Sequence, residues 1–226
     1  MAIKTIYHGS DRVIEYPKFG VGNKKNDYGL GFYCTESLEM AKEWAVGRGT
    51  SGFANEYRFN EDDLNVVDLE SDKYCTLHWL SLLLENRVFD IRAPLALDAR
   101  KYLLENFHVD ISNTDIVKGY RADDSYFTFA NDFIMGTISY RQLQNAMKLG
   151  KLGRQIMIKS PSAFERLEFV DAIEASLTEW LPRREERDRR ARLEYLEGER
   201  FKRMKGDLYI TSILDEEMRF GDARLQ

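Results

Sequence analysis

The sequence is poor in the residues that build metal centres, disulfide frameworks and membrane spans. Only two cysteines and three histidines occur among 226 residues, and Cys34 and Cys75 show neither metal-ligand spacing nor a disulfide framework. No segment approaches the ~18 consecutive apolar residues of a membrane helix, and the N-terminal residues lack the apolar stretch of a signal peptide. We therefore expect buried reduced thiols, no metal, no membrane contact and a cytoplasmic location.

An excess of positive charge is also missing. The chain has 33 Lys and Arg against 38 Asp and Glu, a net charge of −5. The total charge therefore gives no support for nonspecific nucleic-acid binding, although it leaves a local basic face open. A content of 43% hydrophobic and 31% charged residues is typical of a soluble globular protein.

The order of apolar patterns predicts an α+β fold. Strands are expected at 2–9, 29–35, 55–60, 64–70 and 154–160, with a short strand from 114 that turns at Gly119 and a strand or helix lead-in at 166–173. Helices are expected at 36–47, 76–89, 98–110, 125–136 and 139–153. The predicted domain covers residues 1–172. Residues 173–226 are expected to form a helical arm and tail, because the charge-dense run 183–203 interleaves both signs as a solvated helix does.

His8 is the first candidate for a functional residue. It stands in "YHGS", at the expected end of the first strand, directly before Gly9 and Ser10. A glycine at a strand end lets a ligand approach the backbone closely, and an imidazole can donate or accept a hydrogen bond. The alternative is that His8 is an ordinary structural histidine.

Tyr33 is the second candidate, in the stretch "DYGLGFYCT". Strand alternation points Phe32 and Tyr33 to opposite faces, so one can fill the core while the other faces a cleft. Gly29 and Gly31 would leave space for a flat ring to stack on the tyrosine. Such an aromatic platform suits a planar cationic heterocycle such as nicotinamide.

Five stretches in register carry a resemblance to a known family. They are "YHGS", "DYGLGFYCTESLEMAKEWA", "WLSLLLENR", "DIVKGYRADD" and "RQIMIKSPSAFERLEF", and they span roughly residues 5–172. Together they resemble a bacterial family of uncharacterised domains within the ADP-ribosyltransferase superfamily. Members of such groups are often encoded as toxins beside small antitoxin genes.

The resemblance implies a split β-sandwich with peripheral helices, whose cleft holds NAD as substrate without a metal. In the branch with a His-Tyr-Glu triad, His8 and Gly9 match the positions that bind a ribose and the nicotinamide carboxamide, and Ser10 follows them. Tyr33 matches the position that stacks on nicotinamide. The third position departs from the pattern, because "RQIMIKS" offers Gln155 in place of glutamate.

Gln155 has a physical cost for the implied reaction. Cleavage of the glycosidic bond builds positive charge on the ribose, and a neutral amide keeps the orienting hydrogen bond but loses the charge. Losing one such electrostatic group costs about 2.7 to 4 kcal/mol of barrier. Either turnover is slow or another carboxylate enters the site.

The stretch "GYRADDSYF" is where we expect that carboxylate. Asp123 or Asp124, with Asp124 preferred, would lie near the reacting ribose, and Arg121 would bind the pyrophosphate of NAD. The alternative is that one aspartate caps the next helix while Arg121 forms a salt bridge. Lys24 and Lys25, in "GVGNKKNDYG", are candidates for a loop over the NAD site or for a substrate contact, and the alternative is an ordinary loop.

The other candidates have simpler explanations. His78 is expected in a core helix, and His108 at a helix end where the dipole favours it. The stretch "GRGTSG", residues 47–52, lacks the lysine and the context of a phosphate loop and is expected to be a turn. The charged arm 183–203 is expected to contact a partner protein rather than a nucleic acid.

The sequence thus predicts an NAD-dependent mono-ADP-ribosyltransferase that modifies a protein or nucleic acid. The resemblance implies the toxin of a toxin–antitoxin or phage-defence system, with a small antitoxin protein as partner. Two alternatives remain open: a non-catalytic NAD- or nucleotide-binding module, which Gln155 favours, and an NAD glycohydrolase.

Overall fold

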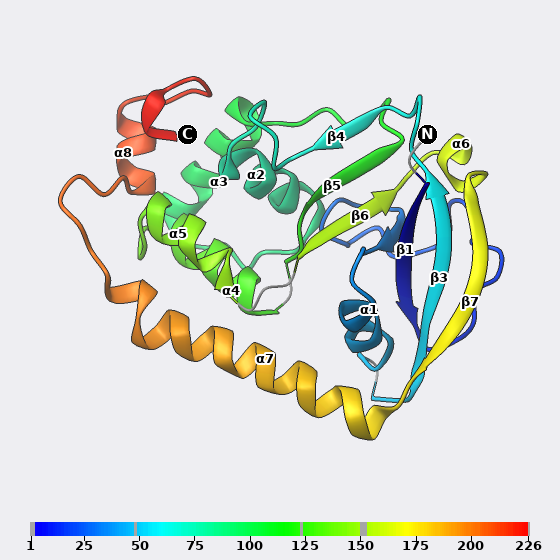
Figure 1. The fold of residues 1–226 in the computed structure, drawn as a ribbon. Helices are drawn as coiled ribbons and strands as arrows, with labels where there is room; N and C mark the ends of the chain where they lie inside the picture. Colours follow the sequence, from blue (N-terminus) through cyan, green and yellow to red (C-terminus); the bar gives the residue numbers. More distant parts are fainter. Residues whose placement is uncertain (1–2, 48, 123, 150–152, 226) are drawn as a thin grey trace.

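The computed structural model describes residues 3–47, 49–122, 124–149 and 153–225, and it has a mixed α+β fold with two β-sheets (Figure 1). The strands are β1 (Ile3–Ser10), β2 (Phe32–Cys34), β3 (Gly52–Asn60), β4 (Val66–Asp68), β5 (Ile116–Tyr120), β6 (Arg154–Ile158) and β7 (Leu167–Ala175). The helices are α1 (Leu38–Ala45), α2 (Thr76–Asn86), α3 (Pro94–Asn106), α4 (Asp124–Ile134), α5 (Tyr140–Ala146), α6 (Pro161–Phe164), α7 (Leu177–Glu197) and α8 (Ile210–Asp215).

The first sheet has the antiparallel order β1-β3-β7, with a register shift in β3 between Glu56 and Tyr57. The second has the order β2-β6-β5-β4, in which only β4 and β5 are parallel. The two sheets meet where Tyr7 and Thr35 exchange backbone hydrogen bonds of 2.8 and 2.9 Å. This junction brings the end of β1 beside β2 and so places His8 next to Tyr33.

Alternating side chains divide the interior into layers. Ile6, Tyr57 and Phe59 from the first sheet pack against Phe32 and Ile156 from the second. The opposite face of the second sheet packs under α2, α3, α4 and α5, and this helical layer holds the largest buried cluster. Helix α1 lies on the outer side of the first sheet, where Ala45 and Val46 pack against Ala175 and Trp180.

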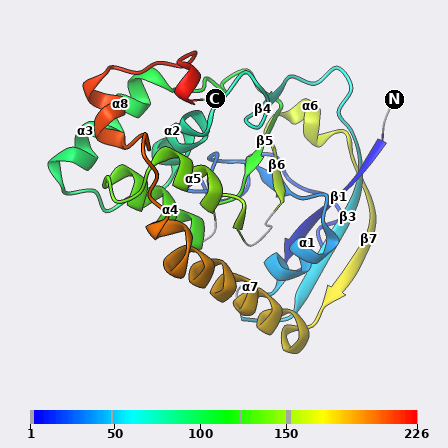
Figure 2. The ribbon, with the colours of Figure 1, turned by 60° about the vertical axis from the view of Figure 1, so that its left-hand side comes forward.

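Helix α7 links the two ends of the molecule. It runs from the end of β7 along one edge of the fold towards α4 and α5, as both views show (Figures 1 and 2). Trp180, Ala191 and Tyr195 of this helix are buried. The Tyr195 hydroxyl donates to Asp132 of α4 at 2.6 Å, and Arg187 pairs with Glu43 of α1 at 2.7 Å.

The expected arm is therefore packed against the rest of the chain. Its exposed side does carry the interleaved ion pairs that the sequence predicts, such as Arg183 with Glu179 and Arg192 with Asp188. The expected boundary at residue 172 falls inside β7, which pairs with β3 as far as Ala175. Helix α7 begins at Leu177 and contains Pro182, so it starts within the predicted arm 173–226 but before the charge-dense run 183–203.

Most predicted elements are confirmed, with shifted ends. The segment 166–173, for which the pattern allows a strand or a helix lead-in, lies almost entirely within strand β7. Helix α3 begins at Pro94, which the sequence predicts in a link; a proline suits the first helical turn because its nitrogen needs no partner there. Among the described residues, no helix has the length and apolar character needed to cross a membrane.

The predicted turn at Gly119 is wrong. Strand β5 continues through Gly119, which pairs with Gln155 of β6. A Cβ at this position would lie 2.7 Å from the Tyr28 hydroxyl oxygen and 3.1 Å from Leu69 Cβ. The glycine is therefore required by close packing of a buried tyrosine and not by a change of chain direction.

Candidate active site

His8 lies two residues before the end of β1, half-buried on the side that faces the second sheet. Its ring stacks on Phe32 with centroids 4.2 Å apart. Its Nδ1 is 2.7 Å from the carbonyl oxygen of Tyr33. Because a carbonyl only accepts, Nδ1 carries the proton and Nε2 of the neutral ring is an acceptor. Burial lowers the pKa of His8, which favours this neutral form.

Tyr33 connects His8 to a second group of polar residues. Phe32 and Tyr33 point to opposite faces of β2 as predicted: Phe32 enters the layer between the sheets, and Tyr33 packs against the helical layer. The Tyr33 hydroxyl donates to the Gly29 carbonyl at 2.7 Å and accepts from the Tyr28 amide at 3.1 Å. Burial raises the pKa of Tyr33, so the hydroxyl stays protonated.

Gln155 is 3% exposed, and its side chain contacts a buried carboxylate. Its Nε2 donates to Asp27 Oδ2 at 3.0 Å and to the Tyr120 carbonyl at 3.1 Å. Both amide hydrogens are therefore used within the protein, and they fix the orientation of the amide. The Oε1 atom is the part of Gln155 that remains to accept a hydrogen bond.

Asp27 gathers donors from three segments of the chain. Its Oδ2 also accepts from the Ala122 amide at 2.9 Å, and its Oδ1 lies 3.5 Å from an Arg87 nitrogen. Burial raises the pKa of Asp27, while these donors and the charge of Arg121 lower it. The carboxylate joins the loop before β2 to β6, to the end of α2 and to the loop after β5.

Arg121 reaches from the β5–α4 loop to helix α1. Its guanidinium carbon lies 4.7 Å from the centroid of the Trp44 ring, a cation–π contact. The Trp44 Nε1–H is buried and has no hydrogen-bond partner among the described residues. The structure thus brings Arg121 to the same end of the two sheets as Gly9, which packs on Trp44.

A cavity of about 200 Å³ opens beside Arg121. Three of its lining residues are basic and two are tyrosines: Arg121, Lys148, Arg154, Tyr120 and Tyr126, with Glu70, Met147 and Gly153 completing it. Arg154 also pairs with Asp68 and with Glu70, the latter at 3.5 Å. The cavity offers several donors to an anionic group.

The glycines of the two motifs serve packing. A Cβ on Gly9 would lie 2.0 Å from the Ala41 carbonyl oxygen, and one on Gly31 would lie 2.4 Å from Met157 Cγ. Gly29 has a φ of +84°, and a Cβ on it would lie 2.7 Å from Asn86 Oδ1. The space that the sequence assigned to a stacked ring is therefore filled by Met157 and Asn86.

The remaining predicted residues are placed as follows. Strand β1 extends through Gly9 to Ser10, so the strand end predicted at Gly9 is wrong by one residue. Ser10 Oγ donates to Asp11 at 3.3 Å. Asp123 lies outside the described residues. Asp124 is the first residue of α4, and its side chain lies outside the description.

The histidines and cysteines without a predicted role have ordinary structural surroundings. His78 is buried in α2, where its Nδ1 accepts from the Cys75 amide at 3.0 Å. His108 lies 3.8 Å from Glu85 after the end of α3. Cys34 and Cys75 are free and buried. Within the described ranges, no group of three His, Cys, Asp or Glu side chains is arranged to hold a metal ion.

Asp27 is the functional candidate that the sequence analysis missed. It is the first residue of "DYGLGFYCT", a stretch whose aromatic residues and glycines alone led to the prediction of a stacking platform. Asp27 directly precedes the buried Tyr28, and a carboxylate at such a position must be paired if it is buried as well. The sequence therefore offers a reason to consider Asp27, but it does not reveal that Gln155 of β6 is the hydrogen-bond partner of this carboxylate.

Comparison with known proteins places the chain in a family. No curated protein and no solved structure matches it. One family matches residues 4–169, which run from the second residue of β1 to the third residue of β7 and include all the residues of the site. The chain therefore belongs to the family described as "Protein of unknown function (DUF3990)".

Proposed function

We propose that this protein is an NAD-dependent mono-ADP-ribosyltransferase that acts in a toxin–antitoxin or phage-defence setting. The observation that carries the proposal is the contact between Asp27 and Gln155. The sequence indicated that a neutral Gln155 needs a carboxylate nearby, and Asp27 supplies one at 3.0 Å. Asp123 and Asp124, the expected sources of that carboxylate, stay predictions, because Asp123 and the Asp124 side chain lie outside the described parts of the chain.

Each residue has a role in the proposed reaction. His8 Nε2 accepts from a ribose hydroxyl, and Tyr33 holds the His8 ring through its backbone carbonyl. Gln155 Oε1 accepts from the 2′-hydroxyl of the reacting ribose, with Asp27 as a positioning residue that fixes the amide. The basic cavity of Arg121, Lys148 and Arg154 receives the pyrophosphate.

The reaction breaks the bond between ribose C1′ and the nicotinamide nitrogen, and nicotinamide leaves with the electron pair. A nucleophile of the acceptor then forms a bond to C1′ and loses its proton to solvent or a base. Positive charge develops on the ribose between these events. A nearby carboxylate lowers the free energy of that state more than it lowers that of bound NAD.

A second candidate is a binding module that holds NAD without cleaving it. It is favoured by the burial of Gln155 and by the use of both its amide hydrogens inside the protein. In that case the cluster stabilises the β5–α4 loop and has no part in chemistry. An NAD glycohydrolase would share the site and use water as the acceptor.

Incubation with adenylate-labelled NAD and a cell lysate separates these functions. We expect release of nicotinamide and label in a macromolecule. Free ADP-ribose without label would indicate a glycohydrolase, and bound intact NAD with neither product would indicate the binding module. Absence of NAD binding, with His8→Ala indistinguishable from the wild type, would refute the proposal.

A matched set of variants tests the role of the pair itself. Asp27→Asn removes the charge, and we expect kcat to fall by about 100-fold or more. The double variant Asp27→Asn, Gln155→Glu again has one carboxylate and one amide in this contact, but the two groups have exchanged positions. We expect it to recover activity relative to the single variant. Asp90→Asn, at an exposed pair with Arg92, is the control.

A further inference from the structure

The segment from Glu15 to Lys25 exposes apolar and basic side chains together. Tyr16 is 82% exposed, Phe19 56% and Val21 65%. Lys18, Lys24 and Lys25 are exposed along the same segment, against the one acidic residue Glu15. In the part of the chain that the structure describes, Lys24 and Lys25 form no ion pair. This segment is therefore basic and aromatic in a chain whose net charge is −5.

Both ends of this 15–25 segment are held by buried side chains. At one end, the Ile14 amide donates to Asn55 Oδ1 at 2.8 Å, and the Ile14 carbonyl accepts from the Tyr57 hydroxyl. At the other end, Asn26 begins a turn closed by the Gly29 amide at 3.0 Å, and Asp27 is buried. The segment that carries the exposed aromatic rings is therefore held to the rest of the protein at both ends.

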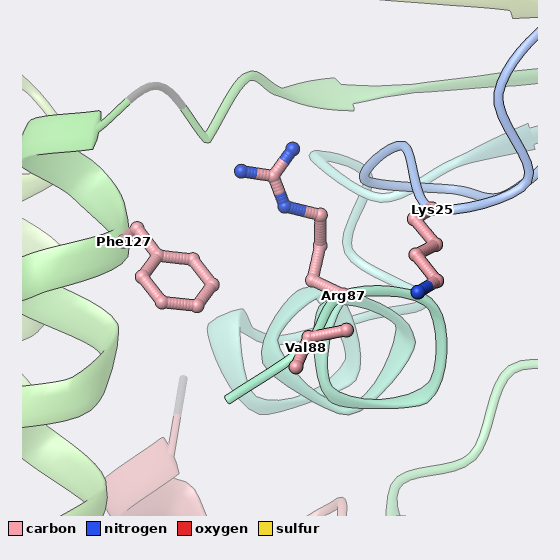
Figure 3. Close-up of a pocket in the computed structure, with 4 residues that line it drawn as sticks. All are labelled: Lys25, Arg87, Val88 and Phe127. Atoms are coloured by element: carbon pink, nitrogen blue, oxygen red, sulfur yellow. The ribbon is translucent and has the colours of Figure 1, made fainter. Parts of the chain in front are cut away.

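Lys25 also belongs to a cavity of about 390 Å³, which lies within the size range of ligand pockets. The other lining residues are Arg87, Val88 and Phe127 (Figure 3). The Arg87 guanidinium carbon lies 5.5 Å from the centroid of the Phe127 ring. The lining holds two cations and no carboxylate, so the cavity favours an anionic ligand.

Arg87 connects this cavity to the proposed active site, because one of its nitrogens lies 3.5 Å from Asp27 Oδ1. Asp27 in turn contacts Gln155. A chain molecule bound along the 15–25 segment and into the cavity would therefore be separated from the Asp27–Gln155 pair by one side chain, that of Arg87.

We propose that the 15–25 segment and the Arg87 cavity bind the acceptor, and that the acceptor is a single-stranded nucleic acid. Tyr16 and Phe19 offer rings on which bases stack, and the lysines and Arg87 pair with phosphates. Protein interfaces also use aromatic residues, but they are depleted in lysine. The role of the nucleic acid as acceptor rests on the proposed function, whereas its binding to the 15–25 segment and the Arg87 cavity does not.

Fluorescence anisotropy with a labelled single strand of about 16 nucleotides tests the proposal, since single-strand sites span about 4–16 nucleotides. We expect saturable binding in the absence of NAD. Tyr16→Ala and Phe19→Ala should each weaken it about 10-fold. Phe201→Ala, which removes another exposed ring far along the chain, should leave it unchanged.

The salt dependence provides an independent readout. Lys24→Gln with Lys25→Gln should reduce the slope of log K against log salt by about 1.4, or about 0.7 for each phosphate that is no longer neutralised. The matched control is Lys101→Gln, an exposed lysine of α3. An equal reduction of the slope in Lys101→Gln would overturn the proposal.

Three further outcomes would also overturn it: no saturable binding, equal affinity for the duplex of the same sequence, or equally effective competition by polyglutamate. His8→Ala should abolish the NAD reaction and leave oligonucleotide binding intact. An active enzyme that labels only proteins and binds no oligonucleotide would refute this inference while sparing the proposed function. Oligonucleotide binding without any NAD reaction would refute the proposed function while sparing the binding of a nucleic acid at this surface.

Discussion

Gln155 Nε2 and Asp27 Oδ2 lie 3.0 Å apart, although 128 positions separate the two residues in the sequence. The contact is between a neutral donor and a carboxylate in a buried site. Such a pair tolerates one charge but not two, because like charges this close raise the pKa of at least one carboxyl group. The identity of Gln155 is thus tied to that of Asp27.

Gln155→Glu should destabilise the protein at neutral pH. The two carboxyl groups would share the site with raised pKa values, so the folded state would bind protons more readily than the unfolded chain. The free energy of unfolding of the variant should therefore approach that of the wild type as the pH falls from about 7 towards about 5. Denaturant titrations at several pH values measure this. A deficit that does not change with pH would contradict the repulsion.

His8 should make the protein less stable as the pH falls below about 6.5. Its pKa is lowered in the folded state, so the unfolded chain takes up the proton first and stability rises with pH in that window. His78 acts in the same direction. His8→Asn, which keeps a donor for the Tyr33 carbonyl, should reduce this slope. An NMR titration that places the His8 pKa above about 6.5 would contradict the expectation.

Gly9→Ala should lower the free energy of unfolding by about 3 kcal/mol, the upper part of the usual range for overpacking. The new Cβ would meet backbone atoms of α1, at 2.0 Å from the Ala41 oxygen and 2.8 Å from the Ala45 nitrogen. Gly20→Ala is the control, because its surroundings are open and only its φ of +75° is unfavourable. That strain costs about 1 kcal/mol. Thermal or denaturant unfolding of the two variants measures the difference.

Removal of residues 173–226 should prevent folding of the remaining chain. The deleted segment supplies Tyr195, Ile210, Ile213, Met218 and Leu225 to the main core. Each buried apolar side chain contributes about 1.5 to 3 kcal/mol, against a total stability of about 5 to 15 kcal/mol. Near-UV circular dichroism and denaturant titration test this. A cooperative transition in residues 1–172 would show that they form an independent domain.

The sequence was most informative where local pattern decides the structure. Periodicity predicted the helix at 76–89 and the strand at 154–160, because each depends on residues within a few positions. It failed at Gly119, where the reason for glycine is the hydroxyl of Tyr28 on another segment. Local pattern carries no information about such a distant neighbour.

The same limit applies to the candidate site. His8 and Tyr33 could be selected from their short motifs, and the structure does bring them together. The Asp27 contact depends on three segments meeting, so the residue types alone could not reveal it. The sequence favoured residues 123–124 as the source of a carboxylate because they are adjacent to a predicted strand, whereas the carboxylate in contact with Gln155 precedes β2.

The packing of Tyr195 to Leu225 into the main core also has a consequence for synthesis of the chain. A ribosome makes the strands that carry His8, Tyr33 and Gln155 before it makes these residues. At about 5 to 20 residues per second, translation of 173–226 takes about 3 to 11 seconds. During that interval the nascent chain carries all the residues of the candidate site but cannot complete its core.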